Sequence, residues 1–149
     1  MIFDRTLEDV NNSKKIREEK VKKGIALSQE EVDVLEKGFI TIATLNRIES
    51  KQQDLKKTFN EMGYYGTQIT NKSWSMSGYF LQSDLNRIVK NNDILKNAYF
   101  IFSSTPTNAG SKAYFEDLNK IEKMLYDLEI MADDMKKYFK ICGTFQCGG

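Results

Sequence analysis

The chain has 149 residues, of which 22 are basic and 21 acidic, and its formal net charge is +1. A hydrophobic fraction of 40% and a charged fraction of 29% are ordinary for a globular protein, and the length suits one domain with its own core. The absence of histidine excludes Ser-His-Asp and Cys-His catalytic units and histidine zinc sites. The near-neutral charge also argues against a dominant nucleic-acid surface.

The chain begins with a pattern that predicts a short polar helix. Thr6 is followed three residues later by Asp9, which is typical of a capped helix start. We expect this helix over residues 7–22, with Gly24 ending it.

A second short helix follows and completes a helical hairpin over residues 1–38. Ser28 and Glu31 form a capping box, and Gly38 closes the helix. In the second half of the first helix, residues 14–23 carry six basic and two acidic side chains. We interpret this run as a solvated helix face, and the alternative is phosphate binding.

The remaining chain repeats one apolar pattern three times. Tetrapeptides that begin at Leu45, Leu85 and Leu118 all read Leu-Asn-(Arg or Lys)-Ile. From each leucine the pattern continues at offsets 3, 7, 10, 14 and 17, which lines one face of a helix about 27 Å long. Three such stripes predict an antiparallel three-helix bundle over residues 39–140, with long connecting loops.

An asparagine follows the first leucine of each copy, on the flank of the stripe. These residues are Asn46, Asn86 and Asn119. We hypothesise that they hydrogen-bond across neighbouring helices and set the helix register, as buried polar groups can do. The alternative is that all three face solvent.

Gly63 ends the first long helix, and an aromatic connection over residues 64–79 follows it. A loop of this length in a small domain is either functional or packed by its own side chains. We take its aromatic residues as candidates for binding a sugar or a partner protein; they are Tyr64, Tyr65, Trp74 and Tyr79. The alternative is that Trp74 and Tyr65 plug the end of the bundle.

The sequence offers no recognisable catalytic or ligand motif. It contains no Walker A loop, no Gly-x-Gly-x-x-Gly and no EF-hand loop. We interpret the acidic residues of the last helix as a solvated face rather than a metal site; they are Asp127, Glu129, Asp133 and Asp134. We therefore expect no enzymatic activity, no cofactor and no metal. In the tail over residues 141–149, Cys142 and Cys147 either close a small disulfide loop or remain free thiols.

Several motifs occur together in one order along the chain. They are Asp4-Arg5-Thr6-x-x-Asp9-Val10, Leu45-Asn46-Arg47-Ile48-Glu49, Lys72-x-Trp74-Ser75 and Asn119-x-Ile121-Glu122-Lys123. This order resembles a small module of phages and prophages of Gram-positive bacteria, found alone or within tail-associated and baseplate-like structural proteins. The tail differs from that module, with cysteines where it usually has serines.

The resemblance implies a non-enzymatic virion structural protein, associated with a tail or baseplate. We expect a single helical domain over residues 1–149 that contacts other virion proteins or further copies of itself in a ring-like oligomer. Without a signal peptide or membrane span, we expect synthesis in the host bacterial cytoplasm, a location in the virion and no membrane partner. The alternative is a module that binds host-surface glycan through loop 64–79. A weaker one is a nucleic-acid-binding adaptor that uses residues 14–23.

Overall fold

The computed structural model describes residues 1–75, 78–98, 104–106 and 114–142, with the backbone alone for 139–142. Over these residues the chain is all-helical and has no strand, which confirms the predicted fold class. The helices are α1 (Leu7–Glu19), the 3₁₀ turn η1 (Val21–Lys23), α2 (Gln29–Gly38), α3 (Ile42–Glu61), α4 (Gln82–Asn97) and α5 (Phe115–Cys142). None of the helices in the described part combines the length and apolar character needed to cross a membrane.

The hairpin forms where its capping residues predict it. The side chain of Thr6 accepts a hydrogen bond from the Asp9 backbone, and Ser28 does the same at the start of α2. The first helix ends earlier than expected, at Glu19, and η1 continues it to the left-handed Gly24, whose φ is +68°.

Gly38 ends α2, as the sequence predicts, and it also has a role in packing. It is the last helical residue of α2 and does not have a positive φ. A Cβ atom there would lie 1.9 Å from Ser13 Oγ and 2.5 Å from the Asp9 carbonyl oxygen. Glycine at this position therefore allows α1 and α2 to approach each other closely.

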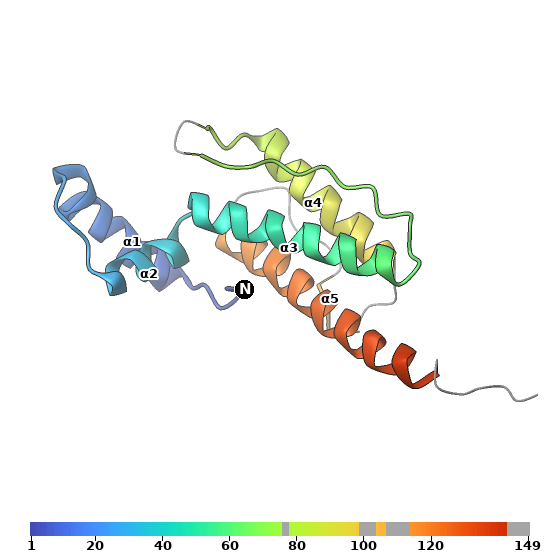
Figure 1. Cartoon of the computed structure of the whole chain (residues 1–149). Coiled ribbons are helices and arrows are strands. Elements are labelled where there is room, and N and C mark those ends of the chain that lie inside the picture. The colour runs from blue at the N-terminus through green and yellow to red at the C-terminus, as the bar shows by residue number, and fades with distance from the viewer. Residues whose placement is uncertain (76–77, 99–103, 107–113, 143–149) are drawn as a thin grey trace, which may run out of the picture.

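The three long helices run parallel, which corrects the antiparallel arrangement expected from the sequence (Figure 1). The residue numbers of contacting pairs increase together along α3 and α5, from Arg47–Glu122 through Lys51–Glu129 to Thr58–Lys136. Contacts between α3 and α4 do the same, from Glu49–Arg87 to Gln52–Asn92.

The long connections make the parallel arrangement possible. A helix of 20 residues such as α3 is about 30 Å long, which about ten extended residues can span. The connections over residues 62–81 and 98–114 both exceed that length. In Figure 1 the first of them runs back beside α3 and α4 from the end of one helix to the start of the next.

Because the helices are parallel, residues at the same offset in the three copies of the repeat lie at the same height in the bundle. Three apolar levels are each 4% exposed or less; they are Leu45, Leu85 and Leu118, then Ile48, Ile88 and Ile121, then Leu55, Leu95 and Leu128. The repeated stripe is thus the core of the bundle, with quasi-threefold symmetry among its helices.

One level of this core is polar. At offset seven, Gln52 Nε2 donates to Asn92 Oδ1 at 2.7 Å and to the Ile88 carbonyl at 2.9 Å. Asn92 Nδ2 donates to the Ile121 carbonyl of α5 at 3.2 Å. These buried bonds form only when the three helices are in this register, so this level specifies the register.

Candidate functional site

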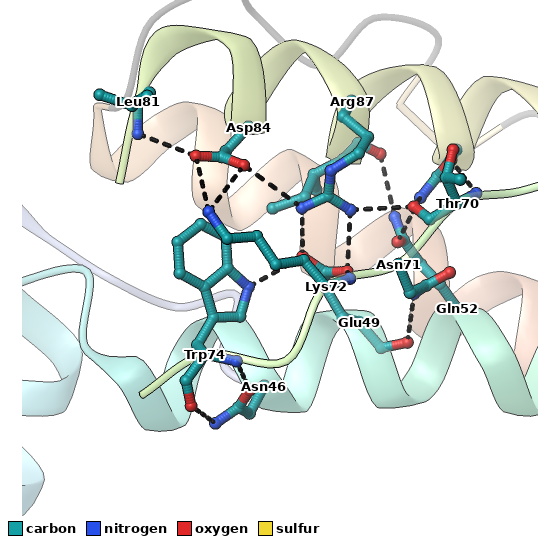
Figure 2. A network of polar contacts seen from close by, with 12 residues as sticks. Asn46, Glu49, Gln52, Thr70, Asn71, Lys72, Trp74, Leu81, Asp84 and Arg87 are labelled. Carbon is teal, nitrogen blue, oxygen red and sulfur yellow. Dashed lines mark hydrogen bonds and ion pairs between the residues drawn. The ribbon is translucent and has the colours of Figure 1, made fainter. Parts of the chain in front are cut away.

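Glu49 is the centre of a buried polar cluster between α3 and α4, shown in Figure 2. We call Asn46, Glu49, Lys72, Trp74 and Arg87 the Glu49 cluster. The Glu49 side chain is 3% exposed. Its Oε1 accepts from Trp74 Nε1 at 2.8 Å and from Arg87 Nη2 at 2.6 Å. Its Oε2 accepts from the Lys72 backbone at 2.6 Å and from Arg87 Nη1 at 2.8 Å.

This hydrogen bonding determines what Glu49 can do chemically. Each carboxylate oxygen already accepts two hydrogen bonds, which fills the acceptor positions of the group. Glu49 therefore holds the fold together, and in this arrangement it has no acceptor position left for a substrate or a metal ion.

Asn46 fixes the connection to α3 through main-chain groups. Its Oδ1 accepts from the Trp74 backbone N–H at 3.0 Å, and its Nδ2 donates to the Trp74 carbonyl at 3.2 Å. We call such an asparagine, bonded to both main-chain groups of one extended residue, a main-chain clamp. On the other side of the indole, Lys72 Nζ lies 4.1 Å from the ring centroid, a cation–π contact.

The charges of this region are matched. The hydrogen bonds that Arg87 donates to Glu49 raise the pKa of the Arg87 guanidinium. Burial alone would raise the pKa of Asp84, but hydrogen bonds from the Leu81 backbone and Lys72 outweigh burial and hold that pKa below its ordinary value. Asp84 thus caps α4 and holds the Lys72 ammonium at 3.3 Å.

Glu122 is the centre of a second cluster of the same design, between α5 and α3. We call Ile2, Arg5, Arg47, Asn119 and Glu122 the Glu122 cluster. Glu122 has a fully buried side chain and accepts from the Ile2 backbone at 2.5 Å, Arg5 Nη2 at 2.6 Å and Arg47 Nη2 at 3.0 Å. Asn119 is the main-chain clamp, bonded to the N–H and carbonyl of Arg5 at 3.1 and 2.9 Å.

The two clusters correspond position by position. In each, the clamped residue, Arg5 or Trp74, also donates a side-chain N–H to the glutamate three residues after the clamp. In each, an arginine at offset two of the neighbouring helix donates to the same carboxylate. Each glutamate therefore ties one extended segment and two helices together.

Arg47 also ties the hairpin to the bundle. Its Nη1 donates to Glu36 of α2 at 2.6 Å, while Nη2 donates to Glu122. Burial alone would lower the pKa of Arg47, but the hydrogen bonds to Glu122 and Glu36 outweigh it and raise that pKa. The side chain thus remains charged between two carboxylates.

The second copy of the repeat differs from the other two. Asn86 is exposed, and its Oδ1 accepts from Gln82 of the same helix at 3.1 Å. Val89 stands at offset four, where the other copies have glutamate. The hypothesis that the three asparagines bond across neighbouring helices therefore gives way to a different arrangement. Two of them clamp extended segments, because the flank of each stripe faces the segment that covers the bundle.

The aromatic candidates of loop 64–79 do not gather on one surface. Trp74 is 6% exposed and packs on Phe80, with ring centroids 5.7 Å apart. Tyr64 meets Phe59 edge-on, about 20 Å along α3 from the Asn46 clamp at 1.5 Å per residue. Tyr65 and Tyr79 are 75% and 84% exposed. Trp74 is thus a core residue, and the described residues of the loop present no shared aromatic platform for a sugar.

The basic run over residues 14–23 is partly neutralised by ion pairs. Lys20 pairs with Glu31 at 2.5 Å and Lys22 pairs with Glu18 at 2.6 Å, so acidic neighbours offset part of the local charge. Cys142 ends α5 with its side chain outside the described part, and Cys147 lies wholly outside it, as does the pairing expected of them.

The acidic residues of α5 are not all solvated. Asp127 is 3% exposed and accepts from Thr105 Oγ1 at 2.8 Å. Asp133 is exposed as expected, and Glu129 pairs with Lys51 of α3. Within the described residues, no group of three or more potential ligands is placed to hold a metal ion.

In comparisons with known proteins, no family model, no curated protein and no solved structure matches the chain. Sequence reasoning also missed Glu49 and Glu122 as the central residues. The signal was present, because a glutamate stands at offset four in the first and third copies of the repeat. A charged residue next to a core position in both copies indicates a shared buried partner.

Proposed function

We propose that this chain is a non-enzymatic structural component of a phage or prophage particle, associated with the tail or baseplate and acting through protein–protein contacts. The supporting observation is that the motifs that carry the phage resemblance lie in the two buried clusters. Arg5, Asn46, Glu49, Trp74 and Glu122 all belong to the two clusters. Chains that share these motifs would share this scaffold.

The geometry is consistent with a mechanical part. Residues far apart in sequence, such as Arg5 and Glu122, are fixed by buried ion pairs and main-chain clamps. Buried polar groups of this kind favour one arrangement over alternatives. A scaffold held in this way suits a subunit that transmits force or keeps neighbours in place.

Peptide mass spectrometry on density-purified particles tests the proposal. We expect this chain in the particles at a fixed copy number that is a multiple of three or six, because tail parts assemble with rotational symmetry. A known major tail protein from the same particles is the positive control. Abundant chain in the lysate with none in the particles would overturn the proposal.

A further inference from the structure

The hairpin formed by α1 and α2 projects from the end of the bundle and has almost no core of its own (Figure 1). Over residues 7–38 only Ser13 is buried, and its hydroxyl donates to the Val34 carbonyl of α2 at 2.6 Å. Helices of 13 and 10 residues are only marginally stable unless an apolar face is packed against another element. The hairpin would therefore gain stability from a partner that covers its apolar side chains.

Several apolar side chains of the hairpin lie on one face. Val32, Leu35 and Phe39 follow one another at spacings of three and four residues, so they share one side of α2. The Arg17 guanidinium of α1 lies over the Phe39 ring, 5.5 Å from its centroid. This contact puts one side of α1, with Val21 four residues further on, at the same face. We call Arg17, Val21, Val32, Leu35 and Phe39 the hairpin face. At its tip, Val21 and Val32 are 45% and 41% exposed.

The length of the chain's own connections leaves the tip of the hairpin face uncovered. The connection that ends at Tyr114 comes nearest, because Tyr114 lines a hollow at the base of the hairpin together with Val10. The nine links from Thr105 to Tyr114 reach at most about 32 Å. Thr105 is bonded to Asp127, thirteen residues along α5 from Tyr114, which uses about 20 Å of that reach. Val21 lies about 16 Å further out than Val10, so a path to Val21 and back exceeds the remaining 12 Å or so.

The other segments outside the described residues start further away. Residues 99–103 and 143–149 begin at the opposite end of the bundle, where α4 and α5 end. The seven residues of the tail reach about 25 Å, whereas α5, with 28 residues, is about 42 Å long. Residues 76 and 77 only join Ser75 to Gly78, whose N–H donates to the Ser75 carbonyl at 3.0 Å. The tip of the hairpin face is thus available to another molecule.

The charges of the hairpin favour a second copy of this chain as that molecule. Residues 7–23 of α1 and η1 carry six basic and four acidic side chains, whereas α2 carries one basic and four acidic. A two-fold axis parallel to the helices would place α1 of each copy against α2 of the other. The helix with net positive charge then meets the helix with net negative charge in both halves of the contact, so the surface is complementary to itself.

We propose that the hairpin faces of two copies bind each other about such an axis and form a four-helix bundle. The axis keeps the levels found within one hairpin, where Ser13 of α1 lies beside Val34 of α2. It therefore brings Lys14 of one copy near Asp33 of the other, and it brings the apolar tips together. Lys14 and Asp33 are both exposed, so the two charges are available to pair when the copies bind.

Sedimentation velocity of the purified full chain over a series of concentrations tests this contact. We expect reversible dimers with a Kd in the micromolar range, because one hairpin face is a small interface. Lys14→Glu puts like charges opposite each other in both halves and should raise the Kd at least about tenfold. Asp33→Lys should do the same. The chain with both changes should dimerise like the parent, because each pair again has opposite charges.

Two further variants separate this contact from unspecific association. Lys57→Glu reverses an exposed charge fifteen residues along α3 from its start and should leave the Kd unchanged. Val32→Ser removes apolar surface at the tip and should weaken the dimer without loss of helical circular dichroism, because Val32 is not buried. A chain that stays monomeric at every concentration would overturn the proposal. Dimers whose Kd is the same in the parent, Lys14→Glu and Val32→Ser would overturn it as well.

The dimer deepens the proposed function by naming one contact surface of the subunit and the partner that covers it. The sedimentation experiment uses no particles, so the dimer can fail while the chain is still found in purified particles. If instead the dimer forms and the particles lack the chain, the proposed function fails and the hairpin contact stands.

Discussion

Replacing Glu49 by alanine should destabilise the fold strongly. The change removes the acceptor of four hydrogen bonds, and it leaves the Trp74 indole N–H and the Lys72 backbone N–H without a partner beside the Arg87 guanidinium. Breaking a buried ion pair by removing one partner costs about 3–5 kcal/mol. We expect a loss of about 4 kcal/mol from a total free energy of unfolding of about 5–15 kcal/mol.

Graded variants divide this cost among its sources. Trp74→Phe removes the N–H donor and part of the ring volume, so it should cost about 2 kcal/mol for the lost hydrogen bond to a charged group and a further amount for the space left in the core. Glu122→Ala should resemble Glu49→Ala, because the two clusters correspond position by position. Glu18→Ala, which breaks a pair whose side chains are more than half exposed, should change the free energy by less than about 0.5 kcal/mol.

Urea denaturation followed by circular dichroism measures these effects in every variant, and tryptophan fluorescence adds a second probe in those that keep Trp74. Trp74 is the only tryptophan in the chain, so its emission reports directly on the cluster and should shift to the red in Glu49→Ala. The double variant with Arg87→Ala should cost less than the sum of the single changes, because each single change leaves the other charge unpaired. A loss below about 1 kcal/mol in Glu49→Ala would refute the view that this cluster anchors the connection.

Three further outcomes are expected from other parts of the fold. Gly38→Ala should cost about 2 kcal/mol in thermal unfolding, since the added methyl group overlaps Ser13 and must push α1 away. Gln52→Leu should cost about 2 kcal/mol by leaving the buried Asn92 Oδ1 without a donor, whereas changing both Gln52 and Asn92 to leucine should restore stability but broaden NMR signals as the register loosens. Because the folded pKa of Asp84 is lowered, its stabilisation is full above the unfolded value of about 4 and disappears as pH falls through the folded value. The urea midpoints of the parent and Asp84→Asn should therefore converge as the pH falls through the folded pKa of Asp84.

The helix starts were predictable because they depend on residues close together in sequence. The caps at Thr6 and Ser28 form within four residues, so the pattern alone specifies them. The relative direction of the three long helices was not predictable, because an apolar stripe is buried equally well when its helix runs the other way. Only contacts such as Arg47–Glu122, between residues far apart in the chain, distinguish the parallel order.

The two clusters were hidden for a similar reason. A glutamate in a helix is usually solvated, and the donors that bury Glu49 come from a connection and from another helix. The tryptophan could be identified as a candidate because it is chemically distinctive, but its burial depends on where residues 70–75 return along the bundle. Burial of this kind follows from tertiary packing, which sequence spacing alone does not encode.

The parallel arrangement and the clamps are linked by a requirement of the backbone. A parallel bundle needs a long return segment before each helix, and an extended segment packed on helices leaves main-chain N–H and carbonyl groups that must find partners. Asn46 and Asn119 supply those partners, and Glu49 and Glu122 fix the same segments by charge. The residues that carry the phage resemblance thus meet a structural need.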